Sequence, residues 1–106
     1  LVTHAGLTRQ IWAETKLTVN TMDAVLREWW EDKYAPVHWI GRTRGGPNVC
    51  GGTFWCDFIE EFVPVPGLVQ VFGHTARKSN GEIRRVEDSY CIDCLDVSQK
   101  FLEMDL

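Results

Sequence analysis

One segment of the chain carries apolar residues at the spacing of an amphipathic helix. Asn20 or Thr21 can cap its start, and charged side chains fill most of the positions between the apolar ones. Pro36 follows the last apolar residue closely and ends the pattern. We therefore predict a helix from about residue 21 to about residue 34, whose aromatic stripe packs against a sheet. The stripe comprises Met22, Val25, Leu26, Trp29, Trp30 and Tyr34.

Shorter apolar runs predict strands. The first two cover residues 1–4 and 68–72, and each leads into a loop that carries a histidine. Turn and polar residues such as Ser79-Asn80-Gly81 separate three further runs, at 82–86, 89–93 and 100–104. These three predict an antiparallel β-meander, and glycines and prolines make residues 41–47 a loop. The pattern as a whole indicates an α+β fold with one mostly antiparallel or mixed sheet and one main helix.

Composition narrows the class of protein. The 106 residues suit a single domain with one modest core. The formal net charge is -4, and basic residues gather only in short groups at 42–44, 77–78 and 84–85, which argues against nucleic acid as a partner. No apolar run approaches the ~20 residues of a membrane-spanning helix, so we expect no membrane partner. No signal peptide is visible either, and we expect a cytoplasmic protein.

The four cysteines allow a zinc site. Cys91 and Cys94 have the spacing of a zinc knuckle, whereas five residues separate Cys50 from Cys56, which is too many for a standard knuckle. The alternative is that these cysteines are small apolar side chains of a core. A disulfide framework is the weaker prediction, because nothing in the sequence indicates secretion.

Two histidines occupy matching positions, each in a glycine-containing turn just after an apolar run. His4 lies in Leu1-Val2-Thr3-His4-Ala5-Gly6, and His74 lies in Val71-Phe72-Gly73-His74-Thr75. A strand end holds a side chain firmly, so the pair suggests a shared metal ion, although a histidine after a strand is more often a hydrogen-bonded structural residue. Arg42 and Arg44 lie in a Gly- and Pro-rich loop, where guanidinium groups suit phosphate or are simply solvated.

The order of these motifs resembles a known family. His-Ala-Gly, Arg-Gly-Gly, Gly-Gly-x-x-Trp-x-Asp and Gly-His-Thr follow one another as in the C-terminal half of calcineurin-like metallophosphoesterases, in the bacterial and phage phosphoprotein phosphatase branch. The resemblance implies that His4 and His74 bind the same one of two divalent metal ions (Mn, Fe or Zn). It implies that Arg44, with Arg42 in reserve, binds the substrate phosphate and that Asp57 supports the site. It also implies an αββα sandwich.

The N-terminal motifs of that family are missing. The chain contains no Asp-x-His, no Gly-Asp and no Gly-Asn-His, which in the family supply the first metal's ligands, the bridging aspartate and the general acid. The chain also lacks an initiator Met, and its first residues resemble the interior of a strand. We therefore interpret residues 1–106 as the C-terminal portion of a metallophosphoesterase domain, whose partner is the missing N-terminal half.

The complete enzyme is expected to hydrolyse a phosphate ester by two-metal chemistry: a phosphomonoester, a phosphoprotein or a dinucleotide polyphosphate. The isolated chain is expected to be inactive. Two alternatives remain: a non-catalytic binding or oligomerisation module derived from that fold, and a four-cysteine zinc module. Strands near Val2, Val69, Val71 and Ile92 would leave an apolar face uncovered, so we expect the isolated chain to form homo-oligomers.

Overall fold

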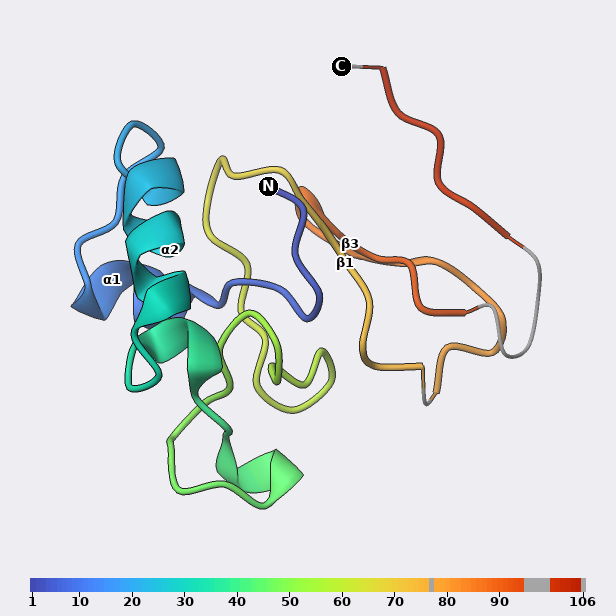
Figure 1. Cartoon of the computed structure of the whole chain (residues 1–106). Helices are drawn as coiled ribbons and strands as arrows, with labels where there is room; N and C mark the ends of the chain where they lie inside the picture. Colours follow the sequence, from blue (N-terminus) through green and yellow to red (C-terminus); the bar gives the residue numbers. More distant parts are fainter. Residues whose placement is uncertain (77, 95–99, 106) are drawn as a thin grey trace.

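A computed structural model of the chain describes residues 1–76, 78–94 and 100–105. Within these ranges the helices are α1 (Arg9–Glu14) and α2 (Met22–Glu31), followed by the short 3₁₀ turns η1 (Pro36–His38) and η2 (Arg42–Arg44). The strands are β1 (Gln70–Phe72), β2 (Arg84–Val86) and β3 (Ser89–Cys91). Figure 1 shows the helices on one side and the strands on the other, with the first residues running between them. The fold is α+β, as the hydrophobic pattern predicted.

The three strands form a mixed sheet in the order β1-β3-β2. β2 and β3 pair antiparallel, with Arg85 opposite Tyr90, which confirms this part of the predicted meander. β1 and β3 pair in parallel, with Val71 opposite Tyr90. The chain leaves β1 through a long connection, returns along β2 and turns back, which lays β3 beside β1 in the same direction.

Residues 1–3 extend the sheet on the other side of β1. Val2 forms a parallel bridge with Val71. The amide of Val71 donates to the carbonyl of Leu1 at 2.9 Å, and the amide of Thr3 donates to the carbonyl of Val71 at 3.1 Å. The strand predicted over residues 1–4 is thus reduced to one bridge, because the chain bends at His4.

A buried glutamine fastens the end of this first segment to β1. The Oε1 atom of Gln70 accepts a hydrogen bond from the amide of Leu7, and its Nε2 atom donates to the carbonyl of the same residue, both at 2.9 Å. Both side chains are fully buried, so these bonds satisfy backbone groups that water does not reach. The loop that carries His4 is therefore held at both of its ends.

Helix α2 is the predicted amphipathic helix, but it is shorter than the pattern indicated. It ends at Glu31, because Asp32 turns to an extended backbone (φ −100°, ψ 104°) and its Oδ1 accepts a hydrogen bond from the amide of Tyr34. Trp30 and Tyr34 are exposed rather than packed. Successive helical residues point about 100° apart, so the face that packs Trp29 cannot also pack Trp30.

One helix was not predicted, and one predicted strand is absent. Helix α1 was not predicted, because six residues are too few to show a helical period; Ile11 is its one buried side chain. Residues 100–104 were predicted as a strand, but no strand is found there, and Figure 1 shows this segment as an irregular trace.

The core lies where helix α1, the first segment and the loop before Gly51 meet. Its buried members are Leu7, Ile11, Leu17 and Cys50. Partly buried side chains surround them: Leu1, Trp12, Met22, Val25, Trp29 and Trp39. A second apolar contact joins the rings of Phe58, Phe62 and Phe72, of which the last two lie 4.6 Å apart. Phe62 and Phe72 lie beside Gly6, next to the core residue Leu7.

Several apolar side chains near the sheet remain exposed. Val2 and Phe101 keep 81% and 82% of their surface accessible, and Val69 and Ile92 are also exposed. Val2, Val71, Ile92 and residues of the 100–104 segment line a cavity of about 430 Å³. The expected association of the isolated chain depends on this face and stays a prediction. Among the helices that the structure describes, none has the length and apolar character needed to cross a membrane.

Candidate metal and phosphate site

The backbone brings the two histidine loops together directly. The amide of Gly73 donates a hydrogen bond to the carbonyl of His4 at 2.8 Å. The amide of Ala5 donates to the carbonyl of Thr53 at 2.6 Å, which attaches the His4 loop to the glycine-rich loop as well. Gly6 has φ +94°, a conformation that glycine adopts freely, and lets the chain turn after His4. The two imidazoles therefore meet because their main chains are already in contact.

The imidazole rings of His4 and His74 are hydrogen-bonded to each other. His4 Nε2 and His74 Nδ1 lie 2.9 Å apart, and the rings meet edge to face with centroids 4.7 Å apart. His74 has φ +70°, an uncommon conformation for a residue other than glycine, which turns its side chain toward His4. Trp55 packs edge-on against the His74 ring at 5.7 Å. The other ring nitrogen of His74, Nε2, is buried and has no hydrogen-bond partner among the residues that the structure describes.

Arg44, from the turn η2, reaches the same region. One terminal nitrogen of its guanidinium group lies 3.1 Å from the carboxylate of Asp57 and donates to the hydroxyl of Thr75 at 3.2 Å. The Arg44 side chain is 28% exposed, and its Nε atom is buried without a hydrogen-bond partner in the described residues. Gly45, in the left-handed conformation with φ +82°, ends the turn. Arg42, by contrast, is exposed on the outside of the turn.

Asp57 holds Arg44 in place. Its side chain is 1% exposed. Its Oδ2 atom contacts Arg44, and its Oδ1 atom accepts hydrogen bonds from the amides of Ile59 and Glu60 at 2.9 and 3.0 Å. A carboxylate bound in this way is fixed, and it fixes its cationic partner in turn. The geometry thus pairs the two predicted residues Arg44 and Asp57.

The environment of His74 favours its neutral form. Burial is the largest cause and lowers the pKa of His74 below its ordinary value, and the positive charges of Arg44 and of His4 lower the pKa further. The carboxylates of Asp57 and Asp93 oppose this change but do not reverse it. A neutral imidazole is the form that binds metal ions.

This lowered pKa predicts how stability depends on pH. Between the lowered pKa of folded His74 and the ordinary value of about 6.5, the unfolded chain binds more protons than the folded one. We expect the free energy of unfolding of the metal-free chain to fall as the pH is lowered through about 6.5, and His74→Gln to remove this part of the fall. Urea denaturation at a series of pH values measures it. An NMR titration midpoint for His74 at or above 6.5 would contradict the prediction.

The four cysteines do not form the alternative zinc site. All four are buried and free, so the structure contains no disulfide among them. In the described residues no group of three or more His, Cys, Asp or Glu side chains is placed to hold a metal ion. Burial, together with the nearby Glu61 carboxylate, raises the pKa of Cys50 to about 11 and raises the pKa of Cys56 as well. Both thiols are therefore protonated at neutral pH in the metal-free chain.

The separation of the His4 and His74 nitrogens can be compared with that of two ligands of one metal ion. Imidazole nitrogens bind zinc at about 2.0–2.1 Å, so two of them lie about 3.3–3.4 Å apart on a tetrahedral ion and about 2.9 Å apart where they subtend a right angle. His4 Nε2 and His74 Nδ1 lie 2.9 Å apart, which is also an ordinary hydrogen-bond distance. One of these two nitrogens carries the proton of that hydrogen bond, and both would bind a metal ion only after this proton had moved to the other nitrogen of its ring. In the described residues no group of three or more possible ligands is placed to hold a metal ion, so a metal ion at this pair is a matter for proposal.

Residues outside the predicted set also belong to this region. The hydroxyl of Thr75 accepts hydrogen bonds from Arg44 and from the amide of Phe58, and so links the His74 loop to the loop of Asp57. In the sequence, only the position of Thr75 directly after Gly73-His74 indicated that it belongs to the site. Glu61 accepts hydrogen bonds from the amides of Gly51 and Asp57 at 2.8 and 3.3 Å, and no sequence pattern indicated that role.

Comparison with models of protein families, with curated proteins and with solved structures yields no match for this chain. What the site does must therefore be inferred from its geometry.

Proposed function

We propose that this chain is the C-terminal portion of a two-metal phosphoesterase domain. His4 and His74 hold one divalent metal ion, Mn, Fe or Zn, and Arg44 binds the phosphate of the substrate. The substrate is a phosphomonoester, a phosphoprotein or a dinucleotide polyphosphate. In the complete domain the sheet described above forms one layer of an αββα sandwich.

The convergence of the predicted residues carries the proposal. His4, Arg44, Asp57 and His74 come from four separate loops, yet His4 contacts His74, and Arg44 contacts both Asp57 and the residue after His74. The four residues thus form two contacting pairs, His4–His74 and Arg44–Asp57, and Thr75 joins the pairs. Two of the three side chains assigned to metal and phosphate, His74 and Arg44, also carry a buried nitrogen without a hydrogen-bond partner in the described residues; in His74 it is Nε2, the nitrogen that faces away from His4.

The residues have distinct roles in this proposal. His4 and His74 supply neutral imidazole nitrogens, and the lowered pKa of His74 favours that state at neutral pH. Arg44 stabilises negative charge on the phosphoryl group, and Asp57 keeps the guanidinium group oriented. The metal ions, when bound, activate a water molecule and stabilise charge on the phosphoryl oxygens.

Two imidazoles are too few to hold a catalytic metal ion firmly, because such sites use at least three protein ligands. The proposal therefore assigns the remaining ligands, the bridging aspartate and the general acid to the missing N-terminal half. The isolated chain retains a weak metal site and lacks useful phosphatase activity.

Metal titration tests the site in the chain as it stands. By isothermal titration calorimetry we expect Mn²⁺ or Zn²⁺ to bind weakly at one site. His4→Ala and His74→Ala should each weaken binding about tenfold or more, because each removes one of two ligands. Cys91→Ser is the control and should leave the affinity unchanged. Loss of binding in Cys91→Ser, with the two histidine variants unaffected, would refute the proposal in favour of a cysteine site.

A further inference from the structure

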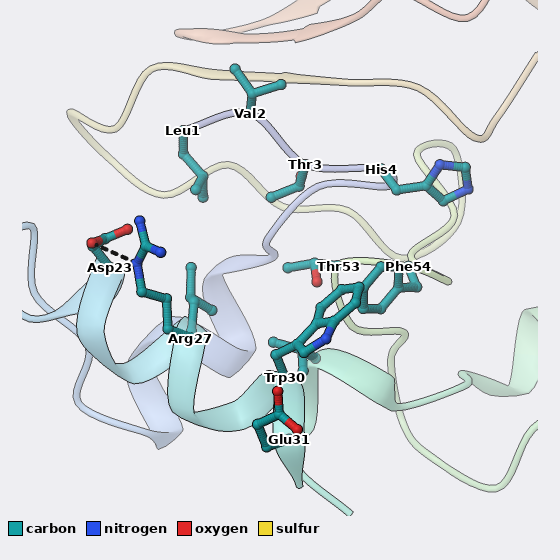
Figure 2. A pocket seen from close by; sticks show the side chains of 12 residues that line it. Leu1, Val2, Thr3, His4, Asp23, Arg27, Trp30, Glu31, Thr53 and Phe54 are labelled. Atoms are coloured by element: carbon teal, nitrogen blue, oxygen red, sulfur yellow. Dashed lines mark hydrogen bonds and ion pairs between the residues drawn. The ribbon is translucent and has the colours of Figure 1, made fainter. Parts of the chain in front are cut away.

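A second cavity adjoins the histidine pair. It has a volume of about 650 Å³, within the range of small-molecule sites, and lies between the first residues of the chain and helix α2. Figure 2 shows His4 and Phe54 at one end and the paired Asp23 and Arg27 at the other. His4 thus belongs to both features: it lines this cavity, and its ring is hydrogen-bonded to His74.

The wall of the cavity includes an aromatic corner. The rings of Trp30 and Phe54 lie 5.3 Å apart at an angle of 59°. Phe54 also contacts His38, whose ring stacks on it at 5.6 Å and 11° and lies 6.4 Å from Trp30. His38 is itself held at the end of α2, with its Nε2 atom 3.2 Å from the carbonyl oxygens of Trp29 and Trp30. The corner is therefore rigid.

Trp30 leaves most of its surface open in spite of this contact. It is 61% exposed, an unusual state for the largest apolar side chain when it lines a cavity. Aliphatic side chains of Leu1, Leu26 and Val37 line the same cavity. The charges of Asp23 and Arg27 are paired with each other at 3.1 Å, and Glu31 adds one carboxylate to a wall that is otherwise formed largely by ring faces and apolar surface.

We propose that this cavity is the subsite for an aromatic ring of the substrate, which stacks on Trp30 while the phosphate lies at His4, His74 and Arg44. The inference rests on the proposed function and specifies its substrate class: phosphate esters whose alcohol part carries a planar aromatic group. A ring face on an exposed indole gains from stacking whatever its substituents. Because His4 lines the cavity, a phosphate at the histidine pair has its ester group at the mouth of the ring subsite.

Binding of three phosphate esters to the intact chain tests the inference. Calorimetry in the presence of Mn²⁺ compares 1-naphthyl phosphate, glycerol 2-phosphate and choline phosphate. We expect 1-naphthyl phosphate to bind about tenfold tighter than the other two, as for stacking of one ring on an aromatic side chain. Trp30→Ala should remove this advantage and leave glycerol 2-phosphate binding unchanged. Tyr34→Ala, which removes an exposed aromatic residue outside the cavity, is the matched control and should change nothing.

The outcomes separate this inference from the proposed function. Equal affinities for naphthyl and glycerol phosphates, tightest binding of choline phosphate, or an advantage that survives Trp30→Ala each overturn the ring subsite and leave the phosphate site standing. If 1-naphthyl phosphate needs Trp30 but binds equally well to His74→Ala and Arg44→Met, the cavity takes aromatic rings and the proposed phosphate site is wrong. Absence of binding by all three esters refutes both.

Discussion

Gly52→Ala is expected to destabilise the chain by about 3 kcal/mol, the upper end of the cost of overpacking and a large fraction of the stability of a small domain. A Cβ atom at position 52 would overlap the carbonyl oxygens of Pro36 and Val37, well inside the 3.0 Å that Cβ atoms essentially never cross. These are backbone atoms of a buried turn, so they cannot rotate away as a flexible side chain could. Urea denaturation followed by tryptophan fluorescence measures the change.

Gly45→Ala provides the matched control for this effect. Nothing lies within 4 Å of a Cβ atom at position 45, so the substitution adds no overlap. Its cost comes only from the backbone, because Gly45 has φ +82°, which costs an alanine about 1–2 kcal/mol. Gly52 does not lie in the left-handed region, so its loss is assigned to contact alone. A loss at Gly52→Ala no larger than that at Gly45→Ala would contradict this assignment.

Asp57→Ala should cost about 3–5 kcal/mol, because it leaves a largely covered positive charge without its partner. The variant removes the ion pair with Arg44 and the hydrogen bonds that Oδ1 accepts from two loop amides. It also frees the guanidinium group, so phosphate binding should weaken together with stability. Chemical denaturation and calorimetry with 1-naphthyl phosphate provide the two measurements.

An exposed ion pair of similar length offers the control. Asp23 and Arg27 also lie 3.1 Å apart, but both side chains are 79% exposed, and such a pair contributes only a few tenths of a kcal/mol. Asp23→Ala should therefore be nearly silent. In the double variant Asp57→Ala/Arg44→Met the loss should be smaller than in Asp57→Ala alone, because no unpaired charge remains. A double variant less stable than the single one would contradict this account of the pair.

The parts of the fold that the sequence predicted are those encoded by neighbouring residues. Helix α2 follows from the spacing of Met22, Val25 and Trp29, and the hairpin of β2 and β3 from two short runs around a tight turn. The parallel pairing of β1 with β3 could not be predicted, because it depends on where a long connection returns the chain. The exposure of Trp30 follows from helix geometry, because two consecutive tryptophans cannot share one helix face.

For the candidate site, too, the sequence predicted some features and not others. The positions of His4 and His74 at strand ends indicated that both side chains are held at the edge of a sheet, and the structure brings the two rings together. The order of motifs singled out Arg44 and Asp57 but not their contact, since an ion pair between loops thirteen residues apart leaves no local pattern. Thr75 joins Arg44 to the loop of Asp57, and Glu61 joins Gly51 to Asp57. Neither residue belongs to a helical or strand-like spacing pattern in the sequence.

The fastening of residues 1–7 to β1 has a consequence for the order of events in folding. The bonds that join Leu7 to Gln70 and His4 to His74 close loops of 63 and 70 residues. Helix α2 and the hairpin need only local contacts, which form early, whereas loops of this length are entropically costly to close and such contacts slow folding. We therefore expect the imidazole pair to form late, when the two ends of the chain meet, so that a metal ion at this pair would bind only the folded chain and would stabilise it.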